Sequence, residues 1–260
     1  MKPFETIAAE TTNYVCTLWL SRPERRNAIN RQMVEELSVF LSQAENDPLI
    51  RVLVLRGKGD CFCAGGDLSW MSQDLPESDR PGMVLANLFN KLYFFSKPIV
   101  VIVHGAAMGG AFGLLATADF VMAEESTRFS FSEVKLGLAP ATISPFVVKR
   151  IGQYRASQLM TTGMAFDPRE AVRYGLIDFA GVPDEIESYA KTITKQITLN
   201  APEAVRTTKR IIRKVADKEV NSGIIRYTAE MLNSIQQSGE AKEGMRAFLE
   251  KRDPVWPNQF

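Results

Sequence analysis

The sequence predicts an α/β fold: a mainly parallel sheet with helical crossovers, followed by a helical C-terminal region. Short apolar runs at 51–56, 98–103 and 120–123 are typical of buried strands, and segments with helical spacing of apolar residues separate them. In the second half of the chain the strand-like runs give way to helical patterns over residues 184–198, 203–217, 223–237 and 239–251. We therefore expect an α/β core over residues 1–200 and a helical region over residues 201–260.

The first strand and helix expected along the chain flank a polar loop. Residues 14–20 alternate between two faces, which predicts a strand with at least one buried face. The loop over residues 21–27 leads to Asn30, whose side chain can cap a helix. That helix is indicated by apolar residues at helical spacing, namely Met33, Val34, Leu37, Phe40, Leu41 and Ala44. It should end before Asp47 and Pro48, because the residue before a proline disfavours helical backbone.

The middle of the chain repeats the order strand, glycine-rich stretch, helix. The strand over 51–56 leads to the stretch 63–67, and polar residues 72–81 then form an expected surface segment. A second helix is indicated by Leu85, Leu88, Phe89, Leu92 and Tyr93. The strand over 98–103 leads to the stretch 105–110, a short apolar helix and a third strand. This alternation favours right-handed crossovers between parallel strands.

The composition is that of an ordinary globular protein and argues against several classes of function. The chain has 31 basic and 30 acidic residues, so nucleic acid and anionic membrane surfaces are not expected partners.

Three cysteines fit a reducing compartment, and Cys61 and Cys63 are too close for an unstrained disulfide. We expect no metal site, because no Cys or His cluster has the required spacing. No apolar run reaches the length of a membrane span, and the N-terminus lacks a signal-peptide core, so we expect a cytoplasmic protein.

Two glycine-rich stretches are the most informative feature of the chain. Each follows a strand-like run, and the first includes Gly66 and the second Gly110. Small residues let a substrate oxygen approach backbone N–H groups, and two converging N–H donors make an oxyanion hole. Either glycine pair alone would more simply permit a tight turn or close helix packing. Together with a carboxylate downstream at Glu133, the two stretches favour chemistry on an acyl compound.

Five ordered motifs carry a resemblance to a known family. They are RPERRNAIN at 22–30, FCAGGDL at 62–68, HGAAMGG at 104–110, FSEVKLGLAP at 131–140 and EGMRAFLEKR at 243–252. Their order over nearly the whole chain resembles the crotonase (enoyl-CoA hydratase/isomerase) superfamily. The resemblance implies a spiral of ββα turns, an acyl-CoA substrate with no separate cofactor, and a homo-oligomer that is a trimer or a hexamer. The C-terminal helical region is then expected to serve trimerisation or to act as a lid.

The resemblance also assigns site residues, one by one. It implies that the backbone N–H groups of Gly66 and Gly110 bind the thioester oxygen and that Glu133 is the catalytic carboxylate. The residues implied to contact coenzyme A are Arg25, Arg26, Ala28, Ala64, Asp67, Leu68, Phe248 and Lys251, in addition to the two glycines. Asp67 is also expected to stabilise its loop and the following helix. Phe248 and Lys251 match a segment that in this family sometimes reaches the site of a neighbouring subunit.

One position departs from the family pattern. Hydratases of the two-glutamate type carry a second glutamate where this chain has Gly113, so Glu133 has no carboxylate partner. The leading interpretation is a hydratase of a branched or carboxylated enoyl-CoA, similar to bacterial methylglutaconyl-CoA hydratases. The alternatives are an isomerase that moves a 3-enoyl double bond to the 2-position and a non-catalytic CoA-binding protein.

Four other residues have simpler interpretations. His104 is expected to be a satisfied core or turn histidine, and Cys63 a small packing residue. Thr142 and Ser144 either line an acyl pocket or satisfy backbone groups near the neighbouring prolines.

Overall fold

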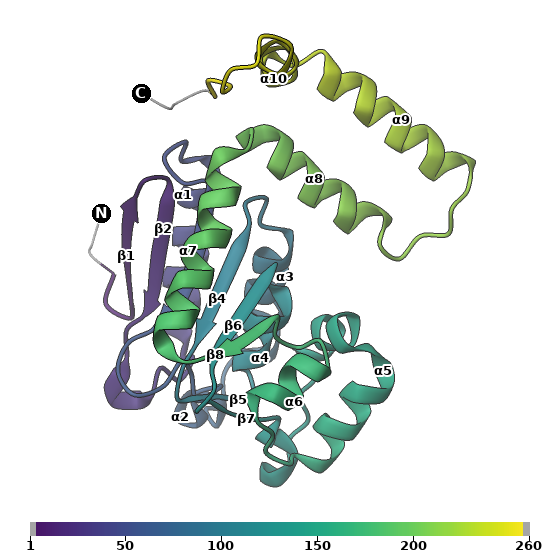
Figure 1. The fold of residues 1–260 in the computed structure, drawn as a ribbon. Helices are drawn as coiled ribbons and strands as arrows, with labels where there is room; N and C mark the ends of the chain where they lie inside the picture. The colour runs from purple at the N-terminus through teal and green to yellow at the C-terminus, as the bar shows by residue number, and fades with distance from the viewer. Residues whose placement is uncertain (1–3, 257–260) are drawn as a thin grey trace.

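A six-stranded sheet organises the chain, as the computed structural model of residues 4–256 shows (Figure 1). The strand order is β1 (Ile7–Thr12), β2 (Val15–Leu20), β3 (Val52–Gly57), β4 (Ile99–Val103), β6 (Phe120–Glu124) and β8 (Phe179–Gly181). Only β1 is antiparallel to its neighbour, which confirms the mainly parallel sheet. Strands β1 and β8 were not expected from the sequence. Residues 1–3 and 257–260, the ends of the two predicted regions, lie outside the described residues.

Helices bury both faces of the sheet. On one face, α1 (Arg31–Asn46), α3 (Pro81–Phe94), α4 (Ala111–Thr117) and α5 (Ser144–Thr162) contribute to the main core with Leu53 and Leu55 of β3. On the other face, α7 (Pro183–Leu199) packs near Val52 and Val54 of the same strand. Successive side chains of a strand point to opposite faces, so a strand covered on both sides is apolar throughout. The side chain of Asn30 accepts a 3.0 Å hydrogen bond from the N–H of Met33, which confirms the predicted cap of α1.

A second, two-stranded sheet corrects the prediction for residues 105–110. These residues are not one continuous loop, because Ala106–Met108 forms β5, which pairs in parallel with β7 (Arg128–Ser130). A three-residue strand is too short to show periodicity in the sequence. A backbone bridge between Cys63 and Ala107 joins the first glycine-rich stretch to the same sheet. This small sheet therefore gathers both glycine-rich stretches and the segment that leads to Glu133.

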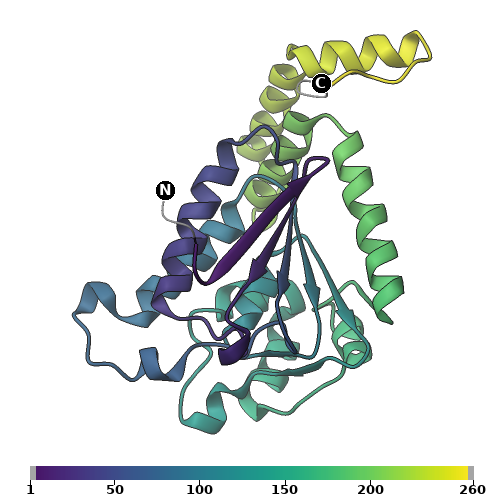
Figure 2. The ribbon, with the colours of Figure 1, turned by 90° about the vertical axis from the view of Figure 1, so that its left-hand side faces the viewer.

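The C-terminal region is helical, as predicted. It consists of α8 (Pro202–Val215), α9 (Ser222–Gln236) and α10 (Gly239–Leu249). Figures 1 and 2 show α9 and α10 extending beyond the end of the core that lies opposite β5 and β7. No side chain of α9 is buried, and large apolar residues such as Ile225, Leu232 and Phe248 are exposed. None of the helices described over residues 4–256 is long and apolar enough to cross a membrane.

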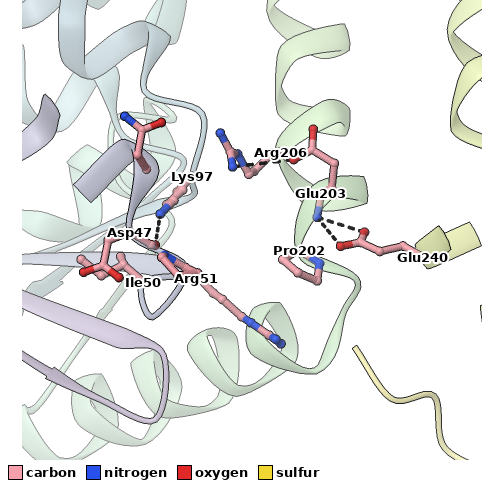
Figure 3. A pocket seen from close by; sticks show the side chains of 10 residues that line it. Asp47, Ile50, Arg51, Lys97, Pro202, Glu203, Arg206 and Glu240 are labelled. Atoms are coloured by element: carbon pink, nitrogen blue, oxygen red, sulfur yellow. Dashed lines mark hydrogen bonds and ion pairs between the residues drawn. The ribbon is translucent and has the colours of Figure 1, made fainter. Parts of the chain in front are cut away.

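Backbone groups at helix ends neutralise the charges where α8 meets the core (Figure 3). A cavity of about 210 Å³ lies between the end of α1 and the starts of α8 and α10. In its wall the Lys97 ammonium donates to the carbonyls of Ala44 and Asp47 at the end of α1. The Glu240 carboxylate accepts hydrogen bonds from the N–H groups of Glu203 and Ala204 at the start of α8. These contacts hold the end of α1 and the starts of α8 and α10 in place around the cavity, so we assign the cavity a structural role.

A buried ion pair fixes α8 to the sheet. The Lys209 ammonium lies 2.6 Å from a carboxylate oxygen of Asp119, and the same oxygen accepts a hydrogen bond from the N–H of Ile99 at 2.8 Å. The ammonium also donates to the carbonyl of Lys97 at 2.8 Å. Burial lowers the pKa of Lys209, and the Asp119 charge opposes that shift. Because a buried charge needs its partner, Asp119 and Lys209 hold α8 against the ends of β4 and β6.

Replacing Asp119 with alanine should destabilise the protein strongly. Asp119→Ala leaves the buried Lys209 ammonium without its counter-charge and the N–H of Ile99 without its acceptor, which we expect to cost about 3 kcal/mol of unfolding free energy. Asp217→Ala is the control, because Asp217 forms an exposed pair with Lys149 and its loss should cost less than about 1 kcal/mol. Urea unfolding of both variants measures the difference, and equal losses would contradict the assignment.

Candidate active site

The two glycine-rich stretches meet backbone to backbone. A Cβ atom placed on Gly110 would lie 3.4 Å from the nitrogen of Gly66, and one placed on Gly65 would lie 3.4 Å from the nitrogen of Gly110. Neither of these two N–H groups donates to another backbone group among the described residues. The structure therefore brings together the two amide groups that the sequence singled out, and both remain free to bind a ligand.

Hydrogen bonds to Ile29 fix the direction of one donor. The carbonyl of Gly65 accepts from the N–H of Ile29 at 2.7 Å, and the N–H of Asp67 donates to the carbonyl of Ile29 at 2.9 Å. In a trans peptide the carbonyl and the following N–H point in opposite directions. The N–H of Gly66 therefore points away from Ile29, and Gly66 lines a cavity.

Asp67 holds the loop before Ile29 against the first glycine-rich stretch. One carboxylate oxygen of Asp67 accepts from the N–H of Ser69 at the start of α2 (Leu68–Met71), and the other lies 3.1 Å from the Arg22 guanidinium. The same guanidinium nitrogen donates to the carbonyl of Ala28 at 2.6 Å. These contacts fit the predicted stabilising role of Asp67. Its contact with a ligand stays a prediction.

Glu133 lies over the second glycine-rich stretch. It follows β7 in a short helical turn (Ser132–Leu136), and a Cβ atom on Gly109 would lie 3.1 Å from its carboxylate oxygen Oε1. The backbone of Gly109 has φ +49°, a conformation that favours glycine. The other oxygen, Oε2, is buried and has no hydrogen-bond partner among the described residues. Burial raises the pKa of Glu133, which suits a group that gives and takes protons near neutral pH.

An apolar cavity of about 170 Å³ connects these groups. Of the described residues that line it, only Ser132, Glu133 and Thr142 have polar side chains. The other lining residues are Ala64, Gly65, Gly66, Leu68, Met71, Leu85, Gly109, Gly110, Leu136, Leu138, Ala139 and Pro140. The arrangement suits an apolar ligand with one oxygen at the paired N–H groups and a carbon atom near a carboxylate.

Residue 113 has no room for a side chain. Gly113 is buried in α4, and a Cβ atom on it would lie 2.4–2.7 Å from three ring atoms of Phe89. Real Cβ atoms do not approach other atoms so closely. The Phe89 ring is itself fully buried. A side chain at residue 113 would therefore require the buried Phe89 ring to move, because that ring occupies the space where the side chain would begin.

The other residues predicted to contact coenzyme A fall into two groups. Ala64 and Leu68 line the cavity, and the exposed Arg25 and Arg26 lie on the adjoining loop with Ala28. The carbonyl of Arg26 accepts a 2.9 Å hydrogen bond from the N–H of Ala64, so this loop borders the cavity wall. Phe248 and Lys251 instead lie in and just after α10, at the far end of the molecule from β5 and β7 (Figures 1 and 2). Within one chain these two residues do not join the site.

Several residues that line the cavity were not identified as site residues from the sequence. Met71 places its sulfur over Gly66, and Leu85, Leu136 and Leu138 form apolar wall. Leu85 shares the helical spacing of core residues, so its sequence pattern does not separate a cavity wall from the core. Leu136 and Leu138 lie within the quoted motif around Glu133, which was the available signal.

The residues given simpler interpretations behave largely as expected. A ring nitrogen of His104 lies 2.8 Å from the carbonyl of Gly59, so the histidine is satisfied at a turn. Cys63 is fully buried, and burial raises the pKa of its thiol to about 12, as for a packing residue. Thr142 lines the cavity, whereas the Ser144 hydroxyl donates to the carbonyl of Ala141. Among the described residues, no group of three or more His, Cys, Asp or Glu is placed to hold a metal ion.

Comparison with known proteins places this geometry in context. The sequence pattern of the family described as "Enoyl-CoA hydratase/isomerase" matches residues 10–259. The chain is 32% identical over 260 residues to trans-2-decenoyl-[acyl-carrier-protein] isomerase of Streptococcus mutans, covering 96% of this chain and 97% of that protein. Pseudomonas aeruginosa AtuE has a similar structure, with a TM-score of 0.92 and 34% identity over 96% of this chain and 99% of AtuE. An enoyl-CoA hydratase of Shewanella pealeana has a TM-score of 0.91 and 32% identity, over 97% and 96% of the two chains.

The burial of Glu133 should be visible in the pH dependence of stability. A carboxyl group whose pKa is raised by folding adds to stability below its unfolded pKa, and this contribution is lost as the pH rises through the folded pKa. Glu133→Gln should therefore match the wild type near about pH 4 and be more stable near about pH 8. Denaturant unfolding across this range measures the difference.

Glu243 provides a control of opposite sign. Hydrogen bonds from Arg252 hold the pKa of Glu243 well below its usual range, so Glu243→Gln should be less stable than wild type at neutral pH. This deficit should shrink as the pH falls. A Glu133→Gln protein that is less stable than wild type at about pH 8 would show that the carboxylate is held by favourable contacts instead.

Proposed function

Because the chain belongs to the enoyl-CoA hydratase/isomerase family, we propose that it adds water across the double bond of an α,β-enoyl-CoA. In this proposal the N–H groups of Gly66 and Gly110 bind the thioester oxygen, and Glu133 is the only acid–base group. One observation carries the proposal: a buried carboxylate oxygen without a partner lies beside two free backbone donors. A buried carboxylate of raised pKa that lines a cavity is typical of a catalytic acid–base group, whereas binding coenzyme A alone does not require one.

The paired donors supply the electronic part of the reaction. As negative charge develops on the thioester oxygen, the two fixed N–H groups stabilise it without having to reorganise. Withdrawing electrons in this way makes the β-carbon of an α,β-enoyl thioester electrophilic. It also makes the α-carbon of a saturated or 3-enoyl thioester acidic. Both effects arise from the same enolate, so the donors alone do not select between hydration and isomerisation.

Glu133 supplies the proton transfers. In hydration, its carboxylate takes a proton from water as the water oxygen bonds to the β-carbon, and the double-bond electrons move to the thioester oxygen. The enolate then collapses, and the α-carbon takes the proton from the Glu133 carboxyl group. Water has been added and Glu133 is again ionised, so one carboxylate completes the cycle.

Isomerisation is the second candidate, and the packing at Gly113 favours it. A shift of the double bond needs one base that moves a proton between the α- and γ-carbons, with no water to hold. The Phe89 ring leaves no space for a second carboxylate at residue 113 that could bind water. The isomerase of Streptococcus mutans among the similar proteins supports the same alternative.

The residues that line the cavity restrict the kind of acyl group that we expect it to accept. None of the described lining residues is a lysine or arginine, so a carboxylated chain such as the 3-methylglutaconyl group would have no counter-charge. The walls of Met71, Leu85 and Leu138 instead favour an unbranched or branched hydrocarbon chain. We assign the coenzyme A part to the outer rim formed by Ala64, Leu68 and the loop of Arg25, Arg26 and Ala28, with Asp67 bracing that loop.

A second copy of the chain would complete the site. We propose a trimer or a hexamer in which α9 and α10 pack on a neighbouring subunit, since their apolar residues are exposed in the single chain. Phe248 is 82% exposed and lies far from its own cavity. Contact between Phe248, Lys251 and the coenzyme A of a neighbour would explain their position.

The products of defined substrates decide between the candidate activities. Crotonyl-CoA should lose its enoyl absorbance by hydration, and faster than 3-methylglutaconyl-CoA, because the cavity offers no cation. Glu133→Gln should retain affinity for a CoA ester and lose about 10²–10⁴-fold in turnover. Rising absorbance with a 3-enoyl-CoA, without hydration of crotonyl-CoA, would establish the isomerase. Binding without turnover of any of these substrates would establish a CoA-binding protein.

The oxyanion hole has its own test in Gly110→Ala. Gly110 has φ −53°, which alanine adopts without strain, but the added methyl group would lie 3.4 Å from the nitrogen of Gly66 and cover that donor. We expect kcat to fall about 10²–10³-fold with stability nearly unchanged. Gly82→Ala is the matched control, since nothing lies within 4 Å of the added methyl group. Unchanged kcat in Gly110→Ala would refute the assignment of the Gly66 N–H as an oxyanion donor.

A further inference from the structure

We propose that Phe89, with Phe146 beside it, forms the end wall of the acyl cavity and sets the longest acyl chain that the enzyme accepts. In this proposal Gly113 lacks a side chain because the Phe89 ring needs its space. The proposal rests on the proposed function, since it takes the cavity beside Glu133 as the acyl site.

Three elements each carry a cavity-lining residue and, three or four residues later, a residue of the proposed wall. Leu85 lines the cavity, and Phe89 lies four residues later on α3. In the same way Gly110 lines the cavity, and Gly113 follows three residues later on α4. One turn of helix advances about 5.4 Å, so Phe89 and Gly113 each lie about one turn along their helix from a residue that lines the cavity.

The third element is the start of α5. Thr142 lines the cavity, and Phe146 follows four residues later, in the first turn of the helix. The rings of Phe89 and Phe146 meet edge to face, with centroids 6.4 Å apart. Thus α3 and α5 each bring a ring to this contact, Gly113 of α4 lies against the Phe89 ring, and in this proposal the two rings close the cavity at its inner end.

Behind this wall the packing continues. Phe146 also contacts Tyr93, with ring centroids 5.4 Å apart, and Phe89 is completely buried. A longer acyl chain would therefore have to displace a ring from a close-packed interior, which is costly. Removing one ring instead leaves a space bounded by the remaining aromatic side chains, and the proposal requires this space to open into the cavity.

The wall predicts a defined change in chain-length preference. Phe89→Ala should raise kcat/KM for 2-decenoyl-CoA relative to crotonyl-CoA by about tenfold or more. One methylene group bound in an apolar pocket changes kcat/KM by at least about that factor. Phe146→Ala should shift the same ratio in the same direction, and serves if Phe89→Ala does not fold. Rates with 2-hexenoyl-CoA and 2-octenoyl-CoA locate the new limit. For an isomerase the matching 3-enoyl-CoA series is used.

Phe40→Ala is the matched control. Phe40 is buried on α1 and meets Phe4 edge to face at 6.4 Å, so its loss removes a comparable ring pair away from the cavity lining. It should lower stability and leave the chain-length ratio unchanged. An unchanged ratio in folded Phe89→Ala and Phe146→Ala, or an equal shift in Phe40→Ala, would overturn the end wall.

Ligand binding separates this proposal from the proposed reaction. Dissociation constants for butyryl-CoA, octanoyl-CoA and decanoyl-CoA need no turnover and can be measured by calorimetry on wild type and variants. If the wild type turns over no enoyl-CoA, the proposed function fails, yet a selective gain in decanoyl-CoA affinity in Phe89→Ala still supports the wall. If turnover is present and neither the rates nor the affinities shift with chain length, the wall alone is wrong.

Discussion

The close approach of two peptide groups, with no Cβ atom between them, is the constraint on which the site depends. Gly65 and Gly66 of one stretch lie directly against Gly110 of the other, so that a Cβ atom on Gly110 would lie 3.4 Å from the nitrogen of Gly66. Pairing of β5 with β7, and the backbone bridge from Cys63 to Ala107, hold the two stretches in this position. The same small sheet carries the chain from β7 to Glu133. A backbone feature thus sets donors and carboxylate together.

Burial of Glu133 connects function to stability. Its carboxylate lies against Gly109, and its Oε2 has no hydrogen-bond partner among the described residues, which costs folding free energy at neutral pH and suits the proton transfers that we propose for it. The surrounding structure offsets that cost through a continuous apolar core and through ionic contacts at the opposite end, where Asp119 and Lys209 secure α8.

The position of Gly113 shows how one packing choice can limit both chemistry and substrate. The Phe89 ring excludes a side chain at 113 and so removes the place for a second carboxylate. The same ring lies one helical turn along α3 from the cavity-lining Leu85, and we have proposed that it forms the end wall for the acyl chain. If the proposed end wall is right, one aromatic side chain both prevents a second carboxylate at residue 113 and sets the depth of the pocket.

The sequence by itself determined the mainly parallel sheet, the cap of α1 at Asn30, the helical tail and the two glycine-rich stretches, because these depend on local periodicity and on residue types with local conformational effects. The tertiary structure alone decided the pairing of β5 with β7, the burial of Glu133 Oε2 without a hydrogen-bond partner among the described residues, and the packing of the Phe89 ring against Gly113. Each of these joins residues that are distant in the chain, and three-residue strands leave no periodic signal. The separation of Phe248 from the cavity likewise follows from the direction of α10, which no local pattern encodes.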